Sequence, residues 1–418
     1  MAKWWLLSAL FYVLSGCSLL PGGGDDTANI AELTRIQDPL QLRARWKAGT
    51  GGVGKHFLNL VPAYDNGRVY ASDYKGRVQA FDADSGKRIW KVNADVLVSG
   101  GPGVGEGIVL LGTSNGEVVA LNAKDGSKLW NVPVAGEVLS VPRVALGIAG
   151  IQTASGDLIG LDVKDGQRRW IYDRSVPTLT LRGTSSPALF DGLIVGGFAS
   201  GKLSAIEITG GRMIWEVSVA VPRGRSELER MVDIDSSPKI RDGVVYVVSF
   251  QGKIAALQLE TGRTLWNRDM SSSAGLGVDD EQIYVTDEQS NVWALDRRSG
   301  ASLWKQEDLH GRTLTAPTPF GDYIAVGDFE GYLHLLSRND GRLVGRVRVD
   351  RDGISAAPVV SDNTLYILGK GGVLAAYEVQ QAKTRRVRKQ KKQKELNEQQ
   401  KAEKPGKTKK FEKLETME

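Results

Sequence analysis

The sequence predicts an all-β fold: an eight-bladed β-propeller of four-stranded antiparallel blades, with the last blade closed by the N-terminal strand. A segment of about forty residues recurs along the chain and reads roughly Gly-x-Val-x-Ala-Leu-(x)4-Gly-x-x-x-Trp. Each copy has room for four short strands separated by turn residues, which is the composition of a propeller blade. The final copy lacks an outer strand, and a matching strand motif stands alone near the N-terminus.

The copies align on a glycine column: Gly76, Gly116, Gly156, Gly201, Gly252, Ser290 (the one exception), Gly331 and Gly372. Fourteen residues after this column stands a tryptophan column: Trp90, Trp130, Trp170, Trp215, Trp266 and Trp304. Fourteen residues before it stands a proline column: Pro62, Pro102, Pro142, Pro187, Pro238, Pro317 and Pro358, with Leu276 as the exception. A fixed spacing of this kind indicates that each copy is one structural unit.

The fourth copy shows how the strands are expected to fall within a unit. We predict strands over residues 185–190, 193–197, 202–208 and 212–217. Glycine-containing pairs such as Asp191-Gly192 separate these runs, as tight hairpins require. Four strands joined by hairpins form one antiparallel blade.

The two ends of the repeat array predict how the ring closes. The seventh unit has Gly345 in the tryptophan column, and the eighth ends after Tyr377 without an outer strand. Residues 43–47 (Arg-Ala-Arg-Trp-Lys) match an outer strand such as residues 128–131 (Lys-Leu-Trp-Asn). We therefore expect the N-terminal strand to complete the eighth blade, which removes a free sheet edge.

The tryptophan column allows two interpretations. Regularly placed aromatic rings can stack cofactors or bases, or they can pack each outer strand against the neighbouring blade. Packing is favoured, because each ring buries on the order of 150–250 Å² of surface.

The N-terminus predicts export and a lipid anchor. A short basic start and an apolar run precede Leu14-Ser15-Gly16-Cys17, which resembles a bacterial lipobox. The resemblance implies cleavage after residues 1–16, acylation of Cys17, and an anchor and linker over residues 17–42. Ser18 fits the pattern of lipoproteins sent to the outer membrane, whereas an ordinary signal peptide with an incidental cysteine is the alternative. Cys17 is the only cysteine, so no disulfide is expected.

Charge is distributed unevenly between the propeller, predicted over residues 43–380, and the tail, residues 381–418. The tail holds 14 Lys/Arg and 6 Asp/Glu, against 40 and 43 in the rest of the chain. It is poor in apolar residues, so we expect a disordered segment that either is simply solvated or lies on anionic lipid or lipopolysaccharide headgroups. An export signal conflicts with a nucleic-acid partner.

Motifs for catalysis are incomplete. Residues 49–55 resemble a phosphate-binding loop, but His56 replaces the required Ser or Thr. The other histidines, His310 and His334, belong to different blades, with no cysteine to complete a zinc site. We therefore expect no enzyme, no metal and no cofactor.

The repeats also resemble two known families. Residues 84–90, 125–130 and 261–266 resemble the Trp-docking repeats of pyrroloquinoline quinone (PQQ) dehydrogenases. Those enzymes use a disulfide between adjacent cysteines, which this chain cannot form. The repeat, the length and the lipobox together are similar to the BamB family, lipoproteins of the β-barrel assembly machinery (BAM), over the mature chain to about residue 379.

The BamB resemblance implies a non-catalytic scaffold that is anchored in the outer membrane by lipid and faces the periplasm. Its partners would be a BamA-like barrel-inserting subunit, other BAM subunits and, as further candidates, nascent outer-membrane proteins. A PQQ-dependent oxidoreductase or quinone-binding propeller remains the alternative.

Two neighbouring connections between repeat units are unusually long. The interval from the tryptophan to the next proline is 12 or 13 residues in most units, but 17 from Trp170 to Pro187 and 23 from Trp215 to Pro238. Enlarged loops on one face of a rigid scaffold are a common way to build a binding surface.

Within these loops the family resemblance implies contact with a periplasmic POTRA domain of the barrel-inserting subunit. The motifs Leu-x-Leu-Arg-Gly and Asp-x-Asp-Ser-Ser-Pro map the contact to Leu179, Leu181, Arg182, Asp233 and Asp235. Because these positions lie outside the repeat columns, we expect their replacement to leave the fold almost unchanged. In the alternative interpretation, Arg182 and the two acids pair with each other and hold the loops.

Overall fold

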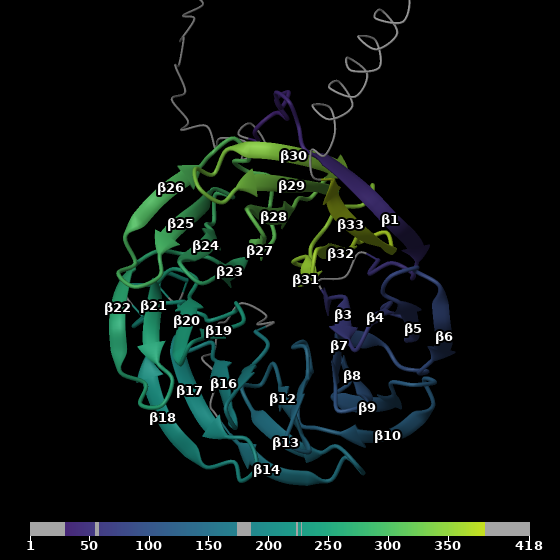
Figure 1. Cartoon of the computed structure of the whole chain (residues 1–418). Coiled ribbons are helices and arrows are strands. Elements are labelled where there is room, and N and C mark those ends of the chain that lie inside the picture. The colour runs from purple at the N-terminus through teal and green to yellow at the C-terminus, as the bar shows by residue number, and fades with distance from the viewer. Residues whose placement is uncertain (1–29, 55–57, 174–184, 223–224, 227, 381–418) are drawn as a thin grey trace, which may run out of the picture.

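The structure is a computed structural model that describes residues 30–54, 58–173, 185–222, 225–226 and 228–380. Eight sheets stand in a ring around a central channel (Figure 1). Seven sheets contain four sequential antiparallel strands running from the channel to the rim, and the eighth is completed by the N-terminal strand. The predicted eight-bladed propeller is confirmed.

In each of the first four blades the strands follow the chain from the channel outward. Blade 1 is β3 (Ala63–Asp65), β4 (Arg68–Ser72), β5 (Arg77–Asp82) and β6 (Arg88–Asn93). Blade 2 is β7 (Val98–Gly105), β8 (Ile108–Thr113), β9 (Glu117–Asn122) and β10 (Lys128–Pro133), with β2 (Asn59–Leu60) pairing parallel to β7. Blade 3 is β11 (Arg143–Ala145), β12 (Ile148–Gln152), β13 (Leu158–Asp162) and β14 (Arg168–Tyr172). Blade 4 is β15 (Ala188–Phe190), β16 (Leu193–Gly197), β17 (Lys202–Glu207) and β18 (Met213–Ser218).

The remaining four blades follow the same order. Blade 5 is β19 (Lys239–Arg241), β20 (Val244–Val248), β21 (Lys253–Gln258) and β22 (Thr264–Asp269). Blade 6 is β23 (Gly275–Val278), β24 (Gln282–Thr286), β25 (Val292–Asp296) and β26 (Ser302–Gln306). Blade 7 is β27 (Thr318–Phe320), β28 (Tyr323–Gly327), β29 (Tyr332–Ser337) and β30 (Leu343–Arg348). Blade 8 is β31 (Val359–Ser361), β32 (Thr364–Leu368), β33 (Val373–Gln380) and β1 (Gln41–Gly49).

The innermost strands are shorter than the sequence predicted. β15 begins at Ala188, after Pro187, rather than at residue 185. A proline has no N–H to donate to a ladder, so pairing starts only after Pro187. The turn between β15 and β16 behaves as expected, since Asp191 and Gly192 both have positive φ (48° and 74°), as this kind of hairpin requires.

The N-terminal strand closes the ring. β1 pairs antiparallel with β33 from Gln41↔Gln380 to Gly49↔Val373 (Figure 1). Beyond β1, the backbone N–H of Thr50 donates to the carbonyl of Gly372 at 2.8 Å. The predicted closing strand is thus confirmed, and the two ends of the ring are held by an antiparallel ladder with one bulge between Ala44 and Trp46.

Each tryptophan of the column joins its blade to the next one. Trp215 on β18 donates from Nε1 to the carbonyl of Leu259, 2.6 Å away in blade 5. Its indole also lies against Gly262, where an added Cβ would come within 2.7 Å of the ring. Trp46 of β1 repeats the arrangement with Gly86 of blade 1. These contacts confirm the packing interpretation and explain why the position ten residues after the first glycine is also glycine.

The exception at Gly345 has a structural reason. The chain enters β1 across the outer strand of blade 7, where the N–H of Leu40 donates to the carbonyl of Val344 at 2.7 Å. The entering chain therefore covers Gly345, where an added Cβ would stand 3.6 Å from the Cβ of Leu40. Upstream, Ala31 bonds to the carbonyl of His310, which docks residues 30–40 on blades 6 and 7.

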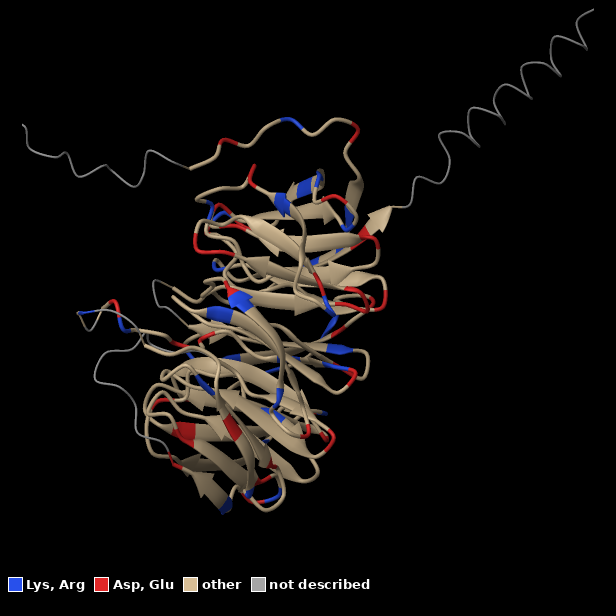
Figure 2. Ribbon diagram, turned by 90° about the vertical axis from the view of Figure 1, so that its left-hand side faces the viewer, with Lys and Arg blue, Asp and Glu red and all other residues tan. Residues whose placement is uncertain are grey.

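Basic and acidic residues are interspersed along the ribbon of the propeller, which Figure 2 shows edge-on. This pattern agrees with the even balance of charge outside the tail. Among the described residues there is no helix with the length and apolar character needed to span a membrane.

Candidate docking surface and central channel

The two long connections leave the outer strands of consecutive blades, β14 and β18, and enter the inner strands of the next blades, β15 and β19. Since all blades share one strand order, both connections belong to the same face of the ring. Leu179, Leu181 and Arg182 lie outside the described residues. The second connection is described over most of its length.

Part of the second connection is a short helical turn. The N–H of Arg230 donates to the carbonyl of Ser226, and the Glu229 carboxylate accepts from the N–H groups of Arg225 and Ser226 at 2.7 and 3.1 Å. These bonds lower the pKa of Glu229 below its ordinary value. This closure resembles the reciprocal capping of a helix start, and it orders the tip of the loop.

The loop presents apolar side chains to solvent and is anchored at its base. Val221 and Leu228 are each 62% exposed, which is high for aliphatic residues. Directly after them in the chain, Met231, Val232 and Ile234 are buried. A rigidly held base with an exposed apolar tip is the arrangement expected of a contact surface.

The two predicted acidic residues lie deeper than the sequence indicated. Asp233 is fully buried, with 0% exposure, and its own backbone carbonyl accepts from the N–H of Phe250 at 2.8 Å. This burial argues against the expectation that replacing Asp233 would leave the fold almost unchanged, because removing a buried carboxylate leaves the polar groups around it without a partner. The loop folds back into the ring after Leu228, which the repeat columns did not reveal.

Asp235 is partly buried and lines the central channel. Burial raises its pKa to about 7, with further contributions from the charges of Asp233 and Glu288. One of its carboxylate oxygens has no hydrogen-bond partner among the described residues. Of the Asp-x-Asp motif, Asp235 thus faces the channel, whereas Asp233 is buried in the wall of the ring.

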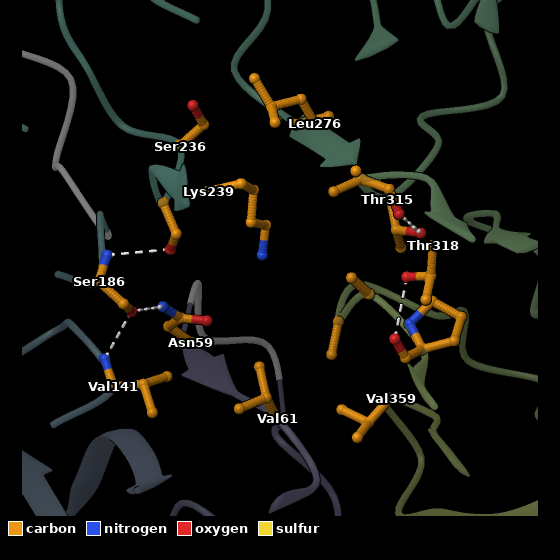
Figure 3. A pocket seen from close by; sticks show the side chains of 18 of the residues that line it. Asn59, Val61, Val141, Ser186, Ser236, Lys239, Leu276, Thr315, Thr318 and Val359 are labelled. Atoms are coloured by element: carbon orange, nitrogen blue, oxygen red, sulfur yellow. Dashed lines mark hydrogen bonds between the residues drawn. The ribbon is translucent and has the colours of Figure 1, made fainter. Parts of the chain in front are cut away.

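The channel itself is a cavity of about 650 Å³ enclosed by the inner strands. The residue after the proline column faces it in seven of the eight blades: Ala63, Gly103, Arg143, Lys239, Gly277, Thr318 and Val359. Two of these, Arg143 and Lys239, are cations. Figure 3 shows the Lys239 side chain extending into the open cavity, across from Thr315 and Val359.

Comparison with known proteins identifies the family. The family model described as "Outer membrane protein assembly factor BamB" matches residues 74–306. A protein of that name from Pseudomonas aeruginosa is 48% identical over 375 residues, covering 90% of this chain and 98% of that protein. The chain belongs to the BamB family. A further BamB from Alkalilimnicola ehrlichii is 47% identical over 348 residues, covering 83% of this chain and 91% of that protein.

Solved structures agree with the fold. BamB from Moraxella catarrhalis superposes with a TM-score of 0.74 at 27% identity, covering 81% of this chain and 100% of that one. A quinohemoprotein alcohol dehydrogenase from Comamonas testosteroni superposes with a TM-score of 0.62 at 14% identity, covering 81% and 76%. The second likeness concerns the propeller fold alone. In the described ranges, no group of three or more His, Cys, Asp or Glu side chains is placed to hold a metal ion.

Sequence reasoning missed four residues of these two regions: Val221, Leu228, Arg143 and Lys239. The two apolar residues carry no sequence signal, because an exposed leucine and a buried one look alike in an irregular loop. Arg143 and Lys239 did carry a sequence signal. Both directly follow the proline column, where the other blades have small or uncharged residues.

Proposed function

We propose that this protein is a non-catalytic accessory factor of outer-membrane β-barrel assembly, held to the outer membrane by lipid on Cys17 and facing the periplasm. Membership of the BamB family supports the assembly role. The observation that carries a docking function is the exposed apolar tip, Val221 and Leu228, on a loop whose following residues are buried in the ring.

The proposed partner is the POTRA region of the BamA-like subunit. Leu179 and Leu181 serve as apolar anchors and Arg182 as the orienting cation. Asp233 is a positioning residue, because its buried carboxylate has no surface to offer a partner. Asp235 is also a positioning residue, and it lies on the channel side of the loop. Val221 and Leu228 extend the apolar contact onto the second loop.

Replacing Leu181 or Arg182 by alanine is expected to weaken binding to the purified POTRA domains by about 2 kcal/mol or more, roughly thirtyfold, because a few central residues carry most of an interface's energy. Leu228→Ser is expected to weaken it as well. The measurement is calorimetric titration of each variant, with a melting curve as the fold control. Leu303→Ser, which alters an equally apolar exposed residue on β26 of blade 6, should leave binding unchanged.

Unchanged affinity in the Leu181, Arg182 and Leu228 variants would remove this face from consideration. Asp235→Ala separates the two interpretations of the acids. A loss of binding with an unchanged melting curve supports a role in docking, whereas a matched loss of stability means that the acid only holds the loops.

Cys17→Ala is expected to abolish acylation and to release the protein from the membrane fraction. The reason is that Cys17 supplies the only thiol in the chain, and several acyl chains are needed for firm anchoring. Metabolic labelling with palmitate and fractionation of cells measure both effects. Labelling that persists in the variant would refute the lipobox interpretation.

A further inference from the structure

The central channel carries a charge pattern that the docking role does not use. Most blades place a small or uncharged residue at the inward position after the proline column, but blades 3 and 5 place Arg143 and Lys239 there. The other titratable side chains in the lining are Tyr64 and Asp235. Two cations on either side of blade 4 therefore share one confined space.

The two cations differ in how they are held. Nε of Arg143 donates to the carbonyl of Pro187 at 3.2 Å, which fixes the guanidinium at the wall. The Lys239 ammonium has no hydrogen bond or ion pair with any residue in the described part of the chain, and it extends into the cavity (Figure 3). An ammonium group in a confined space has three donors to satisfy, and an oxyanion is the partner that satisfies them best.

Neutral donors lie beside the cations. Oγ of Ser186 accepts from the N–H of Val141 at 2.8 Å and from the Asn59 amide at 3.4 Å. Its own proton is bonded to no described residue. Ser237 is similar, since its Oγ accepts from the N–H of Ser186 at 3.1 Å. Figure 3 shows Ser186 and Asn59 on the same side of the cavity as Lys239.

We propose that the central channel binds a small oxyanion, or the phosphate, sulfate or carboxylate group of a larger ligand, between Lys239 and Arg143, with Ser186 and Ser237 as hydroxyl donors. The cavity volume of about 650 Å³ accommodates such a group together with its water. Of the residues in the docking proposal, only Asp235 lines this channel.

The electrostatic state of the channel agrees with this assignment. Partial desolvation by the channel walls, together with the charge of Arg143, lowers the pKa of Lys239 to about 8, although the side chain stays exposed to the open channel. A bound anion would reverse this shift by favouring the charged ammonium. The acid in the lining, Asp235, has its pKa raised to about 7 by burial and by Asp233 and Glu288, so it neutralises the cations only in part.

The test is titration of the full mature chain with sulfate, inorganic phosphate and acetate, followed by NMR of the lysine side-chain ammonium groups. The Lys239 signal is assigned by its absence in Lys239→Gln. Sulfate is expected to shift this signal and to raise the Lys239 pKa, and phosphate and acetate distinguish a phosphoryl from a carboxylate preference. Because the tail also carries cations, the readout must be this signal rather than total heat.

Lys239→Gln is expected to weaken sulfate binding in the channel at least tenfold, as followed by the Tyr64 ring signals, and Lys239→Arg to restore it. Lys91→Gln removes one exposed positive charge from β6 and should leave sulfate binding in the channel unchanged.

Sulfate binding should be tighter near pH 6 than near pH 9, because at the lower pH Asp235 is neutral and Lys239 is charged, while sulfate keeps its charge. An unshifted Lys239 signal, or equal channel binding in Lys239→Gln, would overturn the proposal.

Discussion

Trp215→Ala is expected to lower the free energy of unfolding by about 3–5 kcal/mol, the cost of removing a large buried aromatic side chain. The indole is only 7% exposed and lies between blades 4 and 5. Its Nε1 also donates to the carbonyl of Leu259, which would lose that partner. The change should leave POTRA binding by the folded protein intact, since the side chain belongs to the ring and not to the loops.

Urea unfolding followed by circular dichroism measures the effect. Leu265→Ala is the matched control, because Leu265 is an exposed apolar residue of the next outer strand, β22, and such changes usually stay within about 0.5 kcal/mol. Equal stability of Trp215→Ala and the wild type would show that the tryptophan column does not hold the blades together.

The contact with Gly262 gives a sharper version of this test. Gly262→Ala alone should destabilise the protein, since its Cβ would overlap the Trp215 ring and φ there is +70°. In the Trp215→Ala background the overlap is gone, so the same substitution should cost less. Such non-additivity is the signature of a direct contact, whereas additive losses would place the two residues in separate environments.

The fold was predictable because the repeat imposes one physical solution on every copy. A glycine that lies against an indole and a proline that starts an inner strand recur because each blade meets its neighbour in the same way. The closing strand was predictable for the same reason, as Trp46 makes the contact that the other tryptophans make. The exception at Gly345 coincides with the place where the chain crosses the outer strand of blade 7 on its way into β1.

The functional regions were less predictable because they depart from the repeat. Asp233 stands in an irregular loop, where no periodicity separates a buried acid from an exposed one, and the sequence therefore placed it at the surface. Lys239 does stand at a fixed position of the repeat, directly after the proline column. Its functional role, however, depends on whether the side chain at that position faces the channel. The sequence does not give that direction, whereas the structure places Lys239 in the lining of the central cavity.

A buried ionic cluster in blade 7 could not be inferred either. Asp328 is 0% exposed and accepts hydrogen bonds from Nε of Arg312 at 2.8 Å and from Nε2 of His334 at 2.9 Å. Arg312 also pairs with Glu330 and donates to the carbonyl of Ala31 at 3.1 Å. The cluster thus ties blade 7 to the segment that leads from the N-terminus into β1.

Protonation in the cluster follows from its geometry. Burial by itself raises the pKa of Asp328, but bonds from His334, Tyr332 and Arg312 outweigh it and bring the pKa below its ordinary value. Burial lowers the pKa of His334, more than Asp328 raises it. The carboxylate is therefore ionised and the imidazole neutral at pH 7, with the imidazole proton on Nε2, because an ionised carboxylate can only accept.

Asp328→Ala is expected to lower the free energy of unfolding at pH 7 by about 3–5 kcal/mol, because it leaves the Arg312 charge buried with one partner fewer. Asp308→Ala, which removes an exposed carboxylate nearby, is the control. The pKa of Asp328 is lower in the folded than in the unfolded protein. Its contribution to the free energy of unfolding is therefore fully present above about pH 4 and is lost as the pH falls through the folded-state pKa. Urea unfolding at pH 7 and at pH 3 should therefore show a large difference between variant and wild type that shrinks in acid. A difference that is small at pH 7, or that grows in acid, would mean that Asp328 is not the ionised centre of the cluster.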